Sequence, residues 1–171
     1  MRFLLVLSVV FALASSARAH DPFESWTEAV VHSDRCELLI VMAQATALRL
    51  ADPDARVAAL TPENFRALRD RFVREGAALF ILTAGRTPLA PRETTVELTE
   101  EFDVAFKVVF ARPPPGRLHF HAAFLKKLGN GYGGILDVGD PAGHQLGWEQ
   151  ISWENPNFEV IVPAATPPKK N

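Results

Sequence analysis

The chain has 171 residues, of which 48% are hydrophobic and 22% are charged, and its formal net charge at pH 7 is −2. This mild acidity argues against nucleic acid or an anionic membrane surface as the main partner, since both favour clustered lysine and arginine. The length suits one domain with a single sizeable core.

Residues 1–19 are typical of a secretory signal. Met1-Arg2 is a short positive start, residues 3–14 are apolar, and Ala17-Arg18-Ala19 has the small residues of a cleavage site. The apolar run is too short to span a bilayer, which needs about 20 apolar residues. No later apolar run reaches that length. We expect a mature chain in the periplasm or outside the cell, with one domain over residues 20–163 and a disordered tail over 164–171.

The first predicted elements are strands at residues 30–31 and 36–42, joined by a turn at 32–35, because these segments are apolar and partly β-branched. Residues 47–60 look like an irregular connection. A helix is predicted near residues 62–75, where Thr61 can cap, Pro62 fits the first helical position and Gly76 ends the element. Residues 78–91 then indicate a strand that turns at Ala84-Gly85.

The second half of the chain has strand patterns throughout. Residues 94–111 hold two strands, the second with a strict period of two, and residues 118–125 alternate again. A glycine-rich loop follows at 126–134, then a strand with a turn at Asp140–Gly143, and a last strand at 158–163. Seven to nine short strands and one helix predict an all-β sandwich, immunoglobulin-like or cupredoxin-like, with one helical insertion.

Three histidines form the candidate metal site. The period of two puts His119 and His121 on one face of their strand, with Leu118 and Phe120 on the other. Cleavage after Ala19 would leave His20 with a free amine, so its amine and ring Nδ1 could chelate one ion with the two imidazoles. Such nitrogen ligands suit copper or zinc. The alternative is that His119 and His121 are the polar side of an amphipathic strand and that His20 follows the cleavage site by chance.

These residues resemble a known arrangement. Histidine-brace proteins, among them the soluble copper-binding subunit of particulate methane monooxygenase, begin their mature chain at histidine and supply further ligands from a His-x-His pair on a β-sandwich strand. The resemblance implies copper ligation by His20, His119 and His121. The pattern of residues 60–160 is also similar to the extracytoplasmic domain of hydrogenase/urease accessory proteins of the HupE/UreJ type, which implies a β-sandwich and an association with nickel or cobalt handling.

Other candidate residues have ordinary interpretations beside functional ones. His32 and His144 could add a fourth ligand but stand where solvated residues are common. Cys36 is the single cysteine, and its apolar setting predicts a buried, inert thiol rather than a link to another chain. Trp148 and Trp153 could form a carbohydrate or protein contact patch, but the three tryptophans, Trp26 included, are interpreted mainly as core residues.

Catalytic patterns are weak. The glycines at 129, 131 and 134 fit a dinucleotide fingerprint formally, without the strand before and the helix after that it needs. The acidic residues at 97, 100, 101 and 103 gather at a hairpin tip, where solvated charge is usual. No catalytic residues are therefore predicted. The leading hypothesis is a secreted or periplasmic copper carrier or chaperone, and the alternative is a metal-free binding module that acts through protein contacts in the cell envelope.

Overall fold

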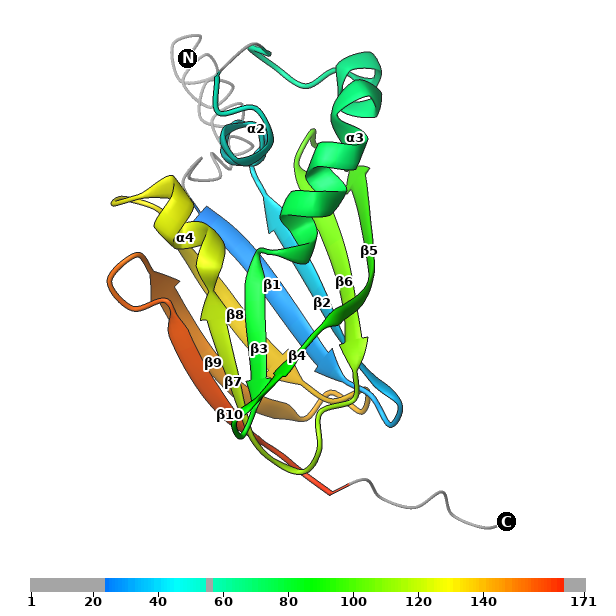
Figure 1. Cartoon of the computed structure of the whole chain (residues 1–171), viewed down its shortest axis with the longest axis vertical. Coiled ribbons are helices and arrows are strands. Elements are labelled where there is room, and N and C mark those ends of the chain that lie inside the picture. Colours follow the sequence, from blue (N-terminus) through cyan, green and yellow to red (C-terminus); the bar gives the residue numbers. More distant parts are fainter. Residues whose placement is uncertain (1–23, 55–56, 165–171) are drawn as a thin grey trace, which may run out of the picture.

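Two facing β-sheets form the body of the protein in a computed structural model that describes residues 24–54 and 57–164 (Figure 1). The expected signal at 1–19, the candidate ligand His20 and nearly all of the expected tail lie outside the described residues. The two sheets with helices inserted between strands confirm the predicted all-β sandwich.

The larger sheet has six strands in the order β5-β6-β2-β1-β8-β9. Its neighbouring strands run antiparallel, except that β1 and β8 run parallel. The bounds of these strands are Glu24–Val31 for β1, Arg35–Met42 for β2, Pro91–Leu98 for β5, Val104–Ala111 for β6, Gly133–Gly139 for β8 and Gln145–Ser152 for β9.

The smaller sheet has four antiparallel strands in the order β10-β7-β3-β4. The chain passes directly from β9, at the edge of the larger sheet, to β10, at the edge of the smaller one. This connection closes one side of the sandwich. The bounds are Phe80–Ala84 for β3, Thr87–Leu89 for β4, Gly116–Ala122 for β7 and Asn157–Val162 for β10.

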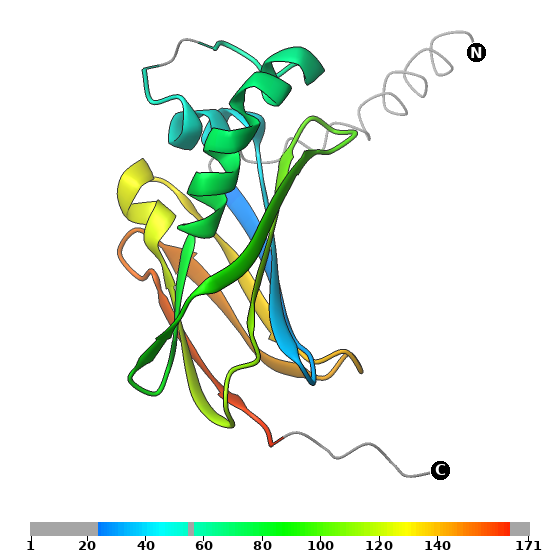
Figure 2. The same ribbon diagram turned by 45° about the vertical axis from the view of Figure 1, so that its right-hand side comes forward.

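The predicted helix is confirmed as α3, Pro62–Ala77, but Gly76, which was expected to end it, lies within the helix. Its start is fixed by a reciprocal cap, in which the Asn64 N–H donates to Thr61 Oγ1 and the Thr61 N–H donates to Asn64 Oδ1 at 2.7 Å. In Figure 2 the helices lie together at one end of the sandwich. None of the described helices combines the length and the apolar character of a membrane-spanning segment.

Two further helices correct the sequence prediction. Helix α2, Gln44–Ala51, occupies part of the expected irregular connection, and α4, Ala123–Leu128, begins where the strand was expected to continue. Both segments are rich in alanine, leucine and basic residues, which are good helix formers. Helix α4 also buries Phe124, Leu125 and Leu128, so tertiary packing supports its short length.

The core lies between the inner faces of the sheets and extends beneath α3. Phe106 and Phe110 of β6 are fully buried, as are Leu118 and Phe120 of β7. Phe72 of α3 packs edge-on against Phe106, with 6.1 Å between ring centroids. The alternation predicted for β6 and β7 is confirmed, and it fixes which side chains of these strands face outward.

Candidate functional site

The two histidines of β7 lie on the outer face of the four-stranded sheet. His119 stands opposite Glu159 of β10 and Thr83 of β3, and His121 stands opposite Asn157 and Ile81. Both imidazoles are half-buried, whereas Leu118 and Phe120 are in the core. The sequence therefore placed this pair on the correct face.

A hydrogen bond orients one ring of the pair, that of His121. Nδ1 of His121 lies 2.8 Å from Oδ1 of Asn157, and because an amide oxygen only accepts, Nδ1 donates in this contact. In the neutral ring the Nε2 atom then carries the lone pair that a metal would use. The neighbouring carboxylate of Glu159 is bound by Arg117 Nη1 at 2.8 Å, so this acid is already paired.

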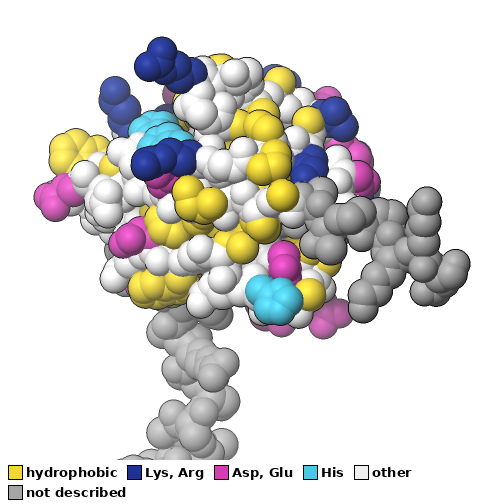
Figure 3. All heavy atoms as spheres, turned by 90° about the horizontal axis from the view of Figure 1, so that it is seen from below, with side chains coloured by type: hydrophobic (Ala, Val, Ile, Leu, Met, Phe, Trp, Pro, Cys, Tyr) yellow, Lys and Arg dark blue, Asp and Glu magenta, His cyan; other side chains and the backbone are white. Residues whose placement is uncertain are grey.

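The remaining expected ligands do not join this pair. His32 Nε2 lies 3.9 Å from Glu37, and Nδ1 of His144 lies 2.9 Å from Asp140. The hydrogen bond from His144 lowers the pKa of Asp140. The same carboxylate also accepts hydrogen bonds from backbone N–H groups, which lower its pKa further. Seen from the end opposite the helices, histidine side chains appear at two separate places (Figure 3). Within the described ranges no three His, Cys, Asp or Glu side chains form a group that could hold a metal.

The third expected ligand, His20, lies outside the described residues. The described chain enters the fold at Glu24, the first residue of β1, which belongs to the six-stranded sheet. The pair of His119 and His121 is on the outer face of the opposite sheet. A site made of all three histidines therefore requires the residues before β1 to cross one end of the sandwich.

Cys36 has the setting that its sequence predicted. It is fully buried on β2, and burial raises the pKa of its thiol to about 12. The thiolate is the reactive form of cysteine, so this environment disfavours nucleophilic and metal-binding chemistry at Cys36.

Exposed tryptophans contradict the core interpretation. Trp26 is 44% exposed, Trp148 52% and Trp153 47%. Trp26 is opposite Ile135 of β8, which is 37% exposed, and Trp148 is opposite Asp137, the next outward residue of β8. We call Trp26, Ile135 and Trp148 the outer aromatic face, because residues paired across a sheet share a face.

The pattern of residues around Trp26 indicates that this side chain is exposed. In β1, Trp26 alternates with Ser25 and Thr27, which are buried, and shares its parity with Glu24 and Glu28. Acidic residues two positions away on each side place a tryptophan on the solvent face of a strand. The interpretation failed because it relied on the usual burial of tryptophan and did not consider this period of two.

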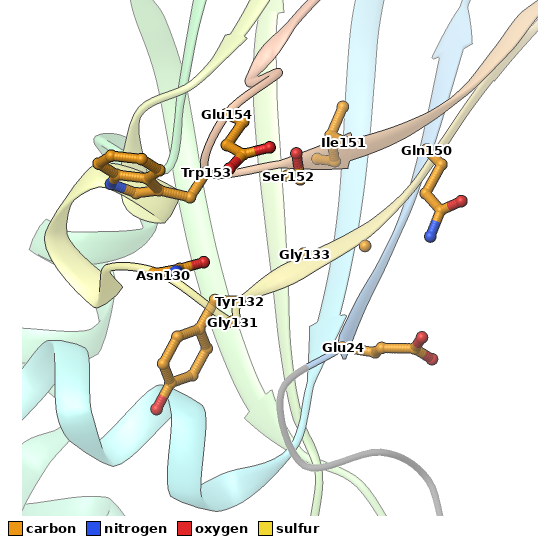
Figure 4. Close-up of a pocket in the computed structure, with 11 residues that line it drawn as sticks. Glu24, Asn130, Gly131, Tyr132, Gly133, Gln150, Ile151, Ser152, Trp153 and Glu154 are labelled. Carbon is orange, nitrogen blue, oxygen red and sulfur yellow. The ribbon is translucent and has the colours of Figure 1, made fainter.

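A pocket of about 290 Å³ opens at the helix end of the six-stranded sheet (Figure 4). Figure 4 shows Tyr132 and Trp153 on one side of it with Asn130 between them, and Glu24 and Gln150 on the other side. The glycine-rich loop forms part of the wall and leads into strand β8, after α4. This order of elements is the reverse of a dinucleotide fingerprint, so the loop lacks that phosphate-binding geometry.

Neither the protein-family models nor the curated proteins compared with this sequence match it.

Proposed function

We propose that this protein is a binding module of the cell envelope that contacts a protein partner through the outer aromatic face. The observation that carries the proposal is the exposure of Trp26, Ile135 and Trp148 on adjacent strands of one sheet. Exposed apolar groups that lie side by side are typical of interaction surfaces, and tryptophan contributes disproportionately to binding energy. The predicted signal supports a location in the periplasm or outside the cell.

The strands give this face a rigid frame. β1 and β8 lie inside the sheet, each hydrogen-bonded to a neighbour on both sides, so Trp26 and Ile135 do not depend on a loop for their position. Half-buried Leu39 and Val41 of β2 extend the apolar surface beside β1. A preformed surface loses little conformational entropy when a partner binds.

The test compares two pairs of substitutions in the native host. Trp26→Ser with Trp148→Ser changes the outer aromatic face, and Ile81→Ser with Ile161→Ser changes exposed residues of the other sheet. We expect the chain to migrate in a larger complex that the first pair abolishes and the second pair leaves intact. Migration as a free chain in the wild type, or equal effects of both pairs, would contradict the proposal.

A second candidate function is copper binding by His119 and His121 together with His20. It is favoured by the shared outward face of the two imidazoles and by the Asn157 contact that leaves Nε2 of His121 for a ligand. Amine and imidazole nitrogens are good ligands for Cu(II). The donor chemistry fits copper, although the described residues supply two histidines of the three.

The copper candidate is tested by titrating Cu(II) into protein that begins at His20. We expect one ion per chain, and a large loss of affinity in a His119→Ala, His121→Ala variant or when one residue precedes His20. His144→Ala is the matched control and keeps the affinity. Equal affinities in all four proteins would leave the histidines without a role in copper binding.

A further inference from the structure

A second pocket, of about 240 Å³, opens on the outer aromatic face itself. It is lined by Trp26, Val41 and Ile135 on its apolar side and by the carboxyl-bearing residues Glu24 and Asp103. We call it the Trp26 pocket. It lies next to the pocket of Figure 4, since Glu24 contributes to both.

The register of the strands explains the hollow. Met42 of β2 pairs with Ser25 of β1 on one side and with Val104 of β6 on the other. The adjoining residues Glu24, Ala43 and Asp103 therefore follow in one row, two strand spacings or about 10 Å from end to end. The small side chain of Ala43 leaves space between two longer acidic side chains.

The two acids of this row are without partners. Neither the carboxylate of Glu24 nor that of Asp103 makes a hydrogen bond or an ion pair within the part of the chain that the structure describes. Among the described residues, no lysine, arginine or histidine lines the pocket. Lys107, further along β6, is bound to Glu37, with 2.9 Å between Nζ and the carboxylate oxygen. The charge of the pocket is thus negative and is not neutralised by the described fold.

A tryptophan beside two carboxylates matches the chemistry of an arginine side chain. The guanidinium group stacks on an aromatic face, its alkyl stem packs on apolar surface, and its five donors can bind two carboxylates at once. An apolar side chain in the same place would desolvate Glu24 and Asp103 without replacing their hydrogen bonds with water. Charge complementarity therefore selects a cationic occupant.

We infer that the Trp26 pocket receives an arginine side chain of the protein partner. This inference rests on the proposed function and names the group that the outer aromatic face recognises. The partner then presents a basic residue within an apolar surface that covers Ile135 and Trp148.

The test is an NMR titration of the full mature chain that follows the three tryptophan indole N–H signals. The probes are N-acetyl-arginine amide and N-acetyl-citrulline amide, which have nearly the same shape but differ in charge. We expect the arginine probe to shift the Trp26 signal and to leave that of Trp153 in place. The citrulline probe should bind up to about fivefold more weakly, the upper end for the loss of an exposed ion pair.

A charge-neutral variant provides the second arm. Glu24→Gln with Asp103→Asn keeps the shapes of both side chains and should weaken arginine binding about fivefold. Glu93→Gln, on the same face but away from the pocket, should not weaken it. Equal binding of both probes, or an unmoved Trp26 signal, would overturn the inference. If the arginine probe does not bind while the Trp26 and Trp148 substitutions still abolish the complex, the proposed function stands without this inference. If the arginine probe binds but the complex survives these two substitutions, the proposed function is contradicted instead.

Discussion

Glu37 is held between two cations on the outer surface of the six-stranded sheet. Lys107 Nζ lies 2.9 Å from one carboxylate oxygen, and Arg35 Nε donates to the other. The hydrogen bonds from Lys107 and Arg35 lower the pKa of Glu37 from its ordinary value near 4.5 to about 2. Because the folded state prefers the charged carboxylate, this group stabilises the fold above the ordinary pKa and ceases to do so as the pH falls toward 2.

We therefore expect Glu37→Gln to lower the free energy of unfolding at neutral pH. The difference from the wild type should shrink as the pH falls from about 4.5 toward 2, where the native carboxylate also becomes protonated. Urea unfolding at a series of pH values measures both proteins. Lys107→Gln should reduce the same pH dependence. If the difference in free energy of unfolding between the wild type and Glu37→Gln stays constant down to pH about 2, this role of Glu37 is wrong.

At the scale of elements, α3 packs tightly against the sheet at Gly76. A Cβ atom built at this position would lie 2.7 Å from Phe106 Cδ1 and 3.0 Å from Thr94 Cγ2. Phe106 is fully buried, so its ring has little space to move. The glycine is thus required for packing near the end of the helix, and α3 is positioned against β5 and β6 by this contact.

Gly76→Ala has two opposing effects on stability, one from helix propensity and one from packing. Alanine favours a helix over glycine by about 1 kcal/mol, whereas overpacking a core costs about 1–3 kcal/mol. We expect a net loss of stability, measured as a lower midpoint of urea unfolding. In a Phe106→Leu background the same substitution should be less damaging, because the ring is gone. A more stable Gly76→Ala protein in the wild-type background would refute the proposed packing role.

The elements differ in how well the sequence predicts them. The strict alternation of β6 and the cap of α3 are local signals, and both elements are found where they were expected. Helices α2 and α4 are short and depend on burial against the rest of the fold, which local patterns do not report. The outward direction of His119 and His121 followed from the period of two. The order of the strands in the sheet places Glu24 and Asp103 in one row. Local sequence patterns do not predict that order.

At the scale of the whole molecule, the two candidate functions use opposite outer faces. The outer aromatic face belongs to the six-stranded sheet, and the pair of His119 and His121 belongs to the four-stranded one. Substitutions on one outer face leave the side chains of the other in place. Partner binding and copper binding are therefore expected to respond independently, so one set of variants distinguishes the two functions.

Photo-crosslinking in intact cells tests whether the outer aromatic face contacts the protein partner. A photoreactive phenylalanine derivative replaces Trp148 in one protein and Ile161, which is 61% exposed on the opposite outer face, in another. We predict a discrete adduct with one envelope protein from position 148 and none from position 161. Absence of an adduct at position 148, or the same adducts at both positions, would contradict the assignment of the outer aromatic face as the partner surface.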